Sequence, residues 1–381
     1  MQAVKKRPAL RLPHGHEITK FIKKNAVMFI AMLAAIITCF FVPIDRQYLN
    51  YFDYKTLTCL FCVLAVVCAL KNIRFFYVLA QRVVSIFKTA RSSILALVYI
   101  TFIGSMLIAN DMALLTFLPL GYFVLTTTNK KKYMAFTFIM QNVAANLGGM
   151  LTPFGNPQNL YLYTKFNIPT LEFMSIMVVP FLTSVALITL CCFIFVKPEK
   201  LELPDEPVKL NVKRAIVYLV LFALSIIIVF KVVHYLIGLA VILVALLILD
   251  RKALKNVDYG LLLTFVFFFI FSGNMSRIPA VQKVFSSLLE KNTLILSALS
   301  CQVISNVPSA ILLSQFTNDY QSLLLGVNVG GVGTIISSLA SLITLREFSA
   351  QPEQSVKKYL LQFSAFNFAF LGILLVVCSL I

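Results

Sequence analysis

Long apolar runs occupy most of this chain, and their number and length restrict what it can fold into. A membrane-spanning helix needs roughly 20 apolar residues at a rise of about 1.5 Å per residue. With 60% hydrophobic and 13% charged residues, the chain carries more apolar surface than one soluble core can bury. We therefore predict an all-α polytopic membrane protein. The apolar runs lie at about residues 25–43, 55–70, 93–127, 133–154, 172–196, 214–233, 235–249, 257–273, 293–316, 323–345 and 359–381.

The basic residues are distributed unevenly between the two predicted sides of the membrane. The formal net charge is +18, from 33 Lys and Arg against 15 Asp and Glu. With the N-terminus inside, and with hairpins at 93–127 and 293–323 that enter and leave on one side, 26 of the 33 basic residues lie inside. Because basic residues mark cytoplasmic loops, this predicts a multi-pass protein of the cytoplasmic membrane and no nucleic-acid partner. Residues 1–24 become a basic cytoplasmic N-terminus, and 197–213 a cytoplasmic linker.

Two parts of the chain repeat one pattern of glycine and polar residues. Residues 144–166 align without a gap on 326–348, and 52–72 resemble 257–277. Many transporters are built from such repeats. The predicted parts are an N-terminal transmembrane half at 25–196 with a repeat at about 50–196, and a C-terminal half at 214–381 with a repeat at about 255–381. The aligned pairs include Asn146 with Asn328, Gly148 with Gly330, Gly149 with Gly331 and Thr152 with Thr334.

Each repeat also contains a stretch that is too polar to span a membrane, at 72–93 and at 276–292. Apolar residues in both stretches keep helical spacing, which predicts amphipathic helices lying along the membrane interface. The charge distribution places the first stretch inside and the second outside. The two repeats are therefore expected to have inverted orientations, with the helices at 214–233 and 235–249 inserted between them.

The glycine-rich stretch NLGGMLTPFGNPQNLYLY at 146–163 should interrupt a helix at membrane depth. Non-helical backbone is tolerated there only where it is buried in protein or lines a polar cavity, so we expect a binding site, facing the second copy at 326–341. The alternative for the glycines is close packing between helices. The candidate substrate-binding residues are Thr152, Asn156, Asn159, Thr334, Ser337 and Ser338, and the candidate ion-coupling residues here are Gly148, Gly149, Gly330 and Gly331.

The two hairpin tips carry IAND at 108–111 and ISNVPS at 304–309. Asn110 and Asn306 are expected to bind substrate and, with Ser305, the coupling ion, because helix N-termini favour anions while amide and carbonyl oxygens suit sodium. Asp111 is an acid inside an apolar run, which makes it a candidate for ion coupling. The alternative is that Asp111 only caps the returning helix. Asp53 and Asp258, at span ends, are expected to be structural.

In this order, IANDMALLTFLPL, NLGGMLTPFGNPQNL and ISNVPSAILL resemble the ion transporter superfamily that includes divalent-anion:sodium symporters, citrate transporters and arsenite permeases. The resemblance implies a scaffold part, a transport part with re-entrant hairpins, an elevator-type movement and a homodimer formed through the scaffold. In the dicarboxylate members each tip carries Ser-Asn-Thr, which binds sodium and a substrate carboxylate. The matching triplets here are Ala109-Asn110-Asp111 and Ser305-Asn306-Val307, and the Asn-Asp pair is closer to the arsenite-permease side.

The expected function is a secondary active symporter of a small inorganic or carboxylate anion, with a di- or tricarboxylate as the first candidate. Sodium at the two tips, or a proton, is the expected coupling ion, and no other cofactor is implied. Because no Lys or Arg lies at depth to pair a substrate carboxylate, a sodium/proton exchanger stays open as an alternative. The resemblance also leaves open an arsenite or oxyanion permease. Without a nucleophile constellation or a metal cluster, an enzyme is not expected.

Overall fold

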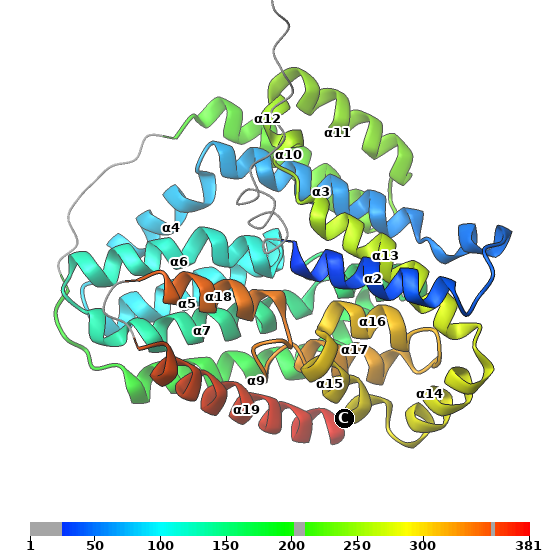
Figure 1. Ribbon diagram of the computed structural model, residues 1–381. Coiled ribbons are helices and arrows are strands. Elements are labelled where there is room, and N and C mark those ends of the chain that lie inside the picture. Colours follow the sequence, from blue (N-terminus) through cyan, green and yellow to red (C-terminus); the bar gives the residue numbers. More distant parts are fainter. Residues whose placement is uncertain (1–24, 202–209, 352–354) are drawn as a thin grey trace, which may run out of the picture.

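The computed structural model describes residues 25–201, 210–351 and 355–381, and these residues form a bundle of helices (Figure 1). Among them, six helices are long and apolar enough to cross a membrane, by length and composition. The predicted class, an all-α polytopic membrane protein, is thereby confirmed. The predicted N-terminus at 1–24 and residues 202–209 of the predicted linker lie outside the described residues. The six helices are α3 (Tyr54–Asn72), α5 (Ala90–Ile108), α9 (Thr170–Phe195), α10 (Val212–Val229), α13 (Tyr259–Ser276) and α19 (Val356–Ser379).

Side-chain caps set where several helices begin. Asp53 accepts a hydrogen bond from Thr56 N (2.9 Å) at the start of α3, and Asp258 accepts one from Leu261 N (2.9 Å) at the start of α13. A carboxylate in this position satisfies one of the N–H groups that a helix start leaves unpaired, and it complements the helix dipole. Both acids therefore have the structural role expected of them.

One group of helices surrounds α3 and α13, and we call it the α3–α13 bundle. α2 packs along α13, while α10 and α11 pack against α3. Small buried residues on α3, such as Cys59, Ala65 and Ala69, allow the neighbouring helices to approach closely. The helices added here are α2 (Ala26–Cys39), α11 (Tyr235–Leu249) and the short α12 (Arg251–Lys255).

The second group, which we call the core bundle, contains α5 to α9 and α15 to α19. α18 packs against α6 and α7, and α16 packs against α8, so helices from both halves of the chain interlock. α9 and α19 lie side by side along the lower edge of Figure 1. The helices added here are α6 (Asn110–Thr127), α7 (Met134–Gly148), α8 (Pro157–Lys165), α15 (Thr293–Ile304), α16 (Asn306–Leu313), α17 (Tyr320–Val329) and α18 (Leu339–Ser349).

Helices are interrupted twice at the centre of the core bundle. Residues 149–156 separate α7 from α8, apart from the short 3-10 turn η3 (Gly149–Leu151), and residues 330–338 separate α17 from α18. Both breaks fall inside the predicted stretches. α4 (Phe75–Ser85) and α14 (Pro279–Lys291) lie in the segments predicted to be amphipathic. Their place at a membrane interface, the inverted orientation of the halves and the re-entrant hairpins stay predictions. Of the four helices in the predicted hairpins, α5, α6, α15 and α16, only α5 is both long and apolar enough to span a membrane.

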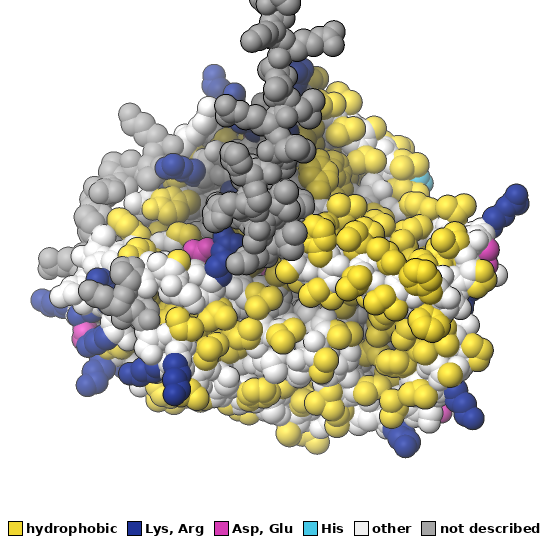
Figure 2. Space-filling model, viewed as in Figure 1, with side chains coloured by type: hydrophobic (Ala, Val, Ile, Leu, Met, Phe, Trp, Pro, Cys, Tyr) yellow, Lys and Arg dark blue, Asp and Glu magenta, His cyan; other side chains and the backbone are white. Residues whose placement is uncertain are grey.

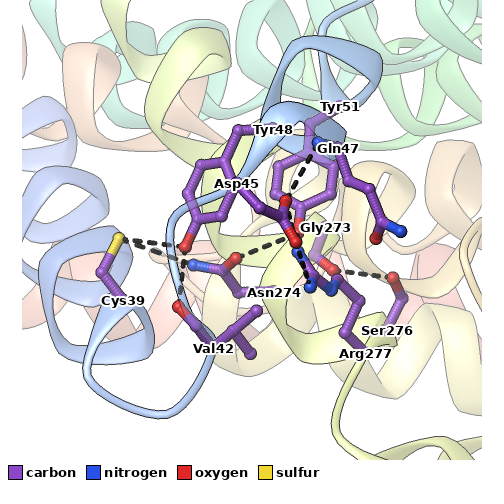
Figure 3. Close-up of polar contacts among 10 residues, drawn as sticks. All are labelled: Cys39, Val42, Asp45, Gln47, Tyr48, Tyr51, Gly273, Asn274, Ser276 and Arg277. Carbon is purple, nitrogen blue, oxygen red and sulfur yellow. Dashed lines mark hydrogen bonds and ion pairs between the residues drawn. The ribbon is translucent and has the colours of Figure 1, made fainter.

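A polar cluster ties the chain after α2 to the end of α13 (Figure 3). Arg277 pairs with Asp45 (Nη2 to Oδ2, 2.6 Å) and donates from Nη1 to the Tyr51 hydroxyl (3.0 Å). That hydroxyl donates to Asn274 Oδ1 at 3.2 Å. A Cβ on Gly273 would lie 2.4 Å from the Tyr51 ring, so only glycine admits the ring there. The cluster clamps η1 (Arg46–Tyr51) onto the α3–α13 bundle.

Charged side chains sit mainly at the margins of the face in Figure 2, and hydrophobic side chains cover much of its middle. At one end Glu199 accepts hydrogen bonds from Lys130 (2.6 Å), Lys132 (2.5 Å) and the Tyr133 hydroxyl (3.0 Å). These donors lower the pKa of Glu199 to about 2. The contact joins two segments predicted to lie inside, 129–132 and the linker, whereas the Asp45–Arg277 pair joins two predicted to lie outside. The side assignment itself stays a prediction.

Candidate transport site

The chain reverses direction between α5 and α6 at Ala109, and between α15 and α16 at Ser305. Ala109 has φ 63° and ψ 153°, and Ser305 has φ 72° and ψ 159°. Only glycine occupies this region readily, and another residue there costs about 1–3 kcal/mol. The same strained conformation is thus kept at both tips, although neither residue is glycine.

Asn110 and Asn306 are the first residues of the returning helices α6 and α16, and they are 4% and 3% exposed. Each Oδ1 accepts a hydrogen bond from the next backbone N–H, of Asp111 or of Val307, at 2.9 Å. Asn110 Nδ2 also donates to Asn146 Oδ1 at 3.3 Å. The N-cap positions of α6 and α16 are occupied by Ala109 and Ser305, which make no side-chain capping bond.

Asp111 does not cap α6. The N-cap residue of α6 makes no side-chain capping bond, and the Asp111 N–H is bonded to Asn110. Asp111 Oδ1 is buried and has no hydrogen-bond partner. The capping alternative is therefore wrong, and a buried carboxylate oxygen without a partner is available for a cation or a proton.

The two breaks are fastened to the two hairpins by corresponding contacts. Thr152 donates its hydroxyl proton to Met106 O on α5 (3.2 Å), and Thr334 donates its own to Gln302 O on α15 (3.0 Å). Met106 precedes Asn110 by four residues, as Gln302 precedes Asn306. Both threonines, predicted to bind substrate, use their hydroxyl protons to hold the breaks against the hairpins.

The paired glycines also occupy corresponding places. A Cβ on Gly148 would lie 2.2 Å from Phe102 O on α5, and one on Gly330 would lie 2.8 Å from Ala298 Cα on α15. Both glycines have helical backbone angles, so close approach and not an unusual φ requires them. The helix-packing alternative therefore accounts for this pair. A Cβ on Gly149 would instead lie 2.5 Å from Asn156 Oδ1, and one on Gly331 would lie 3.1 Å from Asn306 Nδ2.

Asn159 holds the first break from inside. Its Nδ2 donates to the carbonyls of Gly149 (3.1 Å), Met150 (3.2 Å) and Thr152 (3.3 Å), and its Oδ1 accepts from Asn328 Nδ2 at 2.7 Å. One amide thus reaches three carbonyls of the break, of which Thr152 O also accepts from Gly155 N at 3.2 Å. Asn159 was predicted to bind substrate, but its amide is engaged within the protein.

Gln302 binds the backbone of the second break, as Asn159 binds that of the first. Gln302 was not predicted from the sequence to have this role. Its Nε2 donates to Gly330 O (2.9 Å) and Val332 O (3.2 Å), and its Oε1 accepts from Thr334 N (2.8 Å). The residue at the corresponding position of the first hairpin is Met106, so the internal repeat gives no signal for Gln302.

The remaining predicted residues shape the second helix of each broken pair. Asn156 occupies the N-cap position of α8, and its Oδ1 is buried without a partner. Ser338 caps α18 by accepting from Ala340 N (3.2 Å). Ser337 donates to Gly331 O at 2.9 Å, inside the break.

One cavity of about 570 Å³ meets residues at the starts of four helices. Asn110 lines it from α6, Asn306 from α16, Pro157 from α8 and Leu339 from α18. Residues of α2 and α13 also line the cavity. Helix N-termini carry partial positive charge, which favours an anion. Of the predicted residues, Asn110, Asp111, Ser305, Asn306 and Ser338 line this cavity, while the others build the breaks behind it.

The charged side chains of the cavity are acids. Asp111 and Asp258 line it, and no Lys, Arg or His does so among the described residues. No group of three His, Cys, Asp or Glu side chains that could hold a metal ion occurs in the described ranges. An anion here would depend on helix dipoles and on Ser and Asn donors, while a cation has Asp111 available.

Broken helices that meet at a central cavity of a multi-pass helical fold define a membrane transporter. The chain belongs to the citrate transporter family, whose model matches residues 17–319. It is 33% identical to the uncharacterized transporter MJ0456 of Methanocaldococcus jannaschii over an alignment of 300 residues. That alignment covers 77% of this chain and 81% of the relative. The chain is 31% identical over 333 residues to the inner membrane protein YbiR of Escherichia coli, covering 83% and 86% respectively.

Proposed function

We propose that this transporter is a secondary active symporter, which moves a small anion across the cytoplasmic membrane with sodium ions or protons. The observation that carries the proposal is the convergence of four helix starts on one cavity that is also lined by Asp111, a partly buried acid whose Oδ1 has no hydrogen-bond partner. The helix dipoles attract the anion, and Asp111 attracts the cation. Because the family is described as citrate transporters, citrate and succinate are the first anions to test.

The proposal includes an elevator-type movement of the core bundle against the α3–α13 bundle. The cavity lies between the two, since it is lined by residues of α2 and α13 and by the tips of α6 and α16. Sliding one bundle past the other would carry the tips, and whatever they bind, toward the opposite side. A homodimer formed through the α3–α13 bundle is part of the same proposal and rests on the family resemblance.

Uptake into proteoliposomes tests this function. Labelled citrate, succinate, sulfate and arsenite are offered with and without inward sodium or proton gradients, to wild type, Asn110→Ala and Asn306→Ala. Asn367→Ala is the matched control, because this asparagine is equally buried but lies on α19, where it donates to Phe363 O (2.9 Å). We expect gradient-driven uptake that both tip variants lose and the control keeps. Uptake that ignores both gradients would contradict symport.

A sodium/proton exchanger is the second candidate, and the acidic character of the cavity favours it. Two carboxylates and no basic side chain of the described residues line the cavity, which suits a site for cations alone. Sodium-dependent proton flux in liposomes without any organic anion would support the exchanger. Its loss in Asp111→Asn would assign the flux to this acid.

A further inference from the structure

The turn between α10 and α11 reaches across to the core bundle. In this turn Lys231 donates from Nζ to Asn167 Oδ1, and its ammonium group lies over the Tyr163 ring, 4.7 Å from the ring centroid. The neighbouring Phe230 packs edge-on against Phe154, with ring centroids 5.7 Å apart. Tyr163 lies on α8, Asn167 follows α8 and Phe154 lies in the first break, so all three belong to the core bundle. No ion pair of the described residues joins the two bundles, which sets this charged contact apart.

Lys231 and Asn167 occupy equivalent places at two helix ends. Each directly follows the C-cap residue of its helix, α10 or α8. The backbone N–H of this residue and that of the next one donate to carbonyls of the last turn, at 3.0 and 3.2 Å in α10 and at 3.3 and 3.1 Å in α8. Such a Schellman motif requires a left-handed residue, commonly glycine, and Lys231 has φ 65° while Asn167 has φ 50°. Asparagine adopts this conformation more readily than lysine. The backbone alone would favour glycine at position 231, so the lysine side chain is the feature that explains this position.

The charge of Lys231 lies where the C-terminal ends of α8 and α10 meet. The C-terminal end of a helix carries partial negative charge, and a cation close to it is stabilising. Two such ends repel each other unless a positive charge lies between them. Lys231 supplies that charge, and the face of the Tyr163 ring attracts it further.

α8 connects this contact to the cavity. Its first residue, Pro157, lines the cavity, and its last residue, Lys165, lies two positions before Asn167. The 9 residues of α8 span roughly 13 Å at 1.5 Å per residue. At the other side of the contact, α10 and α11 pack against α3 (Figure 1). Lys231 therefore fastens a helix that helps to form the cavity to the α3–α13 bundle.

We propose that Lys231 is a latch, which holds the core bundle in the arrangement described above and must leave α8 before that bundle moves against the α3–α13 bundle. This inference rests on the proposed function, since it assumes that one bundle moves against the other. Apolar surfaces that slide past each other exchange one set of contacts for another, because hydrophobic attraction has no direction. A hydrogen bond depends on distance and angle, so the ammonium group meets Asn167 in one position of the bundles only.

Cross-linking the two helix ends tests the latch in the full chain, reconstituted in proteoliposomes. The double variant Asn167→Cys with Lys231→Cys is treated with a short, reducible bifunctional thiol reagent, and each single variant is treated in the same way as a control. We expect the cross-linked double variant to lose gradient-driven uptake of whichever anion among citrate, succinate, sulfate and arsenite the wild type takes up, and reduction to restore it. Undiminished uptake by the fully cross-linked protein would overturn the inference. A failure of the two introduced thiols to cross-link would overturn it as well.

Removal of the charge tests the latch without a transported anion. Val303 is 72% exposed and lines the cavity from α15, so Val303→Cys can be labelled with a membrane-impermeant maleimide from each side in turn. Lys231→Met in this background should change the ratio of the two labelling rates about three- to tenfold, because it removes a hydrogen bond that stabilises one arrangement. Lys231→Arg keeps the charge and should keep most of the wild-type ratio. Lys283→Met, at an exposed position of α14, is the matched control. An unchanged ratio in Lys231→Met would overturn the latch, even if the unfolding midpoint fell.

The failure of this inference is distinguishable from failure of the proposed function. If none of the four anions is taken up but Lys231→Met changes the labelling ratio, the symporter fails and the latch stands. If the cross-linked protein takes up an anion along a gradient as fast as the wild type does, the latch fails and the symporter stands.

Discussion

The tip at Ala109 and the tip at Ser305 have the same backbone but different charge. Both bend through the same strained conformation, both place an asparagine first in the returning helix, and both are fastened to a break by a threonine. One then continues with Asp111 and the other with Val307. The two tips therefore share a backbone conformation but differ in the charge of the residue that follows the asparagine. Such a difference suits a site that binds two unlike ligands.

The largest expected effect comes from Asp111→Asn. Asp111 is partly buried and, on the proposed function, pairs with the coupling cation; removing one partner of such a pair costs up to about 3–5 kcal/mol, so gradient-driven transport should fall about 100-fold. Val307→Asn at the corresponding position should cost only a few-fold. Asp319→Asn is the control, because Asp319 caps α17 by accepting from Ser322 N (3.1 Å) and asparagine caps equally well. Similar losses at both tips would show that the charge difference is irrelevant.

The next effect concerns the packing that the tips share. Gly148→Ala and Gly330→Ala should each lower the free energy of unfolding by about 1–3 kcal/mol, because the added Cβ meets backbone of α5 or α15. Denaturation in detergent measures this loss. Gly372→Ala has no heavy atom within 4 Å of its Cβ and should be tolerated. If only one of the two variants lost stability, the two glycines would not have equivalent packing roles in the two halves of the chain.

A smaller and opposite effect is expected at the tips themselves. Ala109→Gly and Ser305→Gly should each stabilise the fold by about 1 kcal/mol, because glycine relieves the positive φ. Asn129 has φ 56° in a loop, where asparagine is well tolerated, so Asn129→Gly should change little. Unfolding midpoints compared across the three variants would show whether the strain is equal in both halves. No gain at either tip would mean that the strain is absent.

The smallest effect concerns the two loops that follow the returning helices α6 and α16. Lys130 and Lys132, in the loop after α6, form ion pairs with Glu199. The loop after α16, at 314–319, contains no ion pair among the described residues. The pKa of Glu199 is lowered from 4.5 to about 2, so its stabilising contribution is complete above about pH 4.5 and is lost as pH falls through about 2. Glu199→Gln should therefore be slightly less stable at pH 7, and the difference should vanish near pH 2. A constant difference across this range would exclude the ion pair as its cause.

The interruptions and the tips could be predicted because their cause is local. Glycine and proline in an apolar run leave backbone groups unpaired, and Gly149 to Asn156 do so where the pattern indicated. The asparagines at both tips were found from their duplication. The positive φ of the preceding residues Ala109 and Ser305 could not be predicted, because neither residue is glycine.

The roles within the site could not be predicted, because they depend on contacts between distant residues. Thr152 and Asn159 carry the polar groups expected of ligands, yet Thr152 donates to a carbonyl of α5 and Asn159 donates to carbonyls of the first break. Gln302 has no polar counterpart in the first repeat. Apolar residues of α2 and α13 also line the cavity, and their place in its lining follows from packing across the whole chain.

The packing of α2 against α13 also sets the order of events during synthesis. Asn274 on α13 donates to Thr38 on α2 at 3.2 Å, and the two residues are 236 positions apart in the chain. At roughly 5–20 residues per second, the ribosome needs on the order of 10 to 50 seconds to make that interval. During this time α13 has not yet been made, so α2 lacks this packing partner and Thr38 lacks that bond.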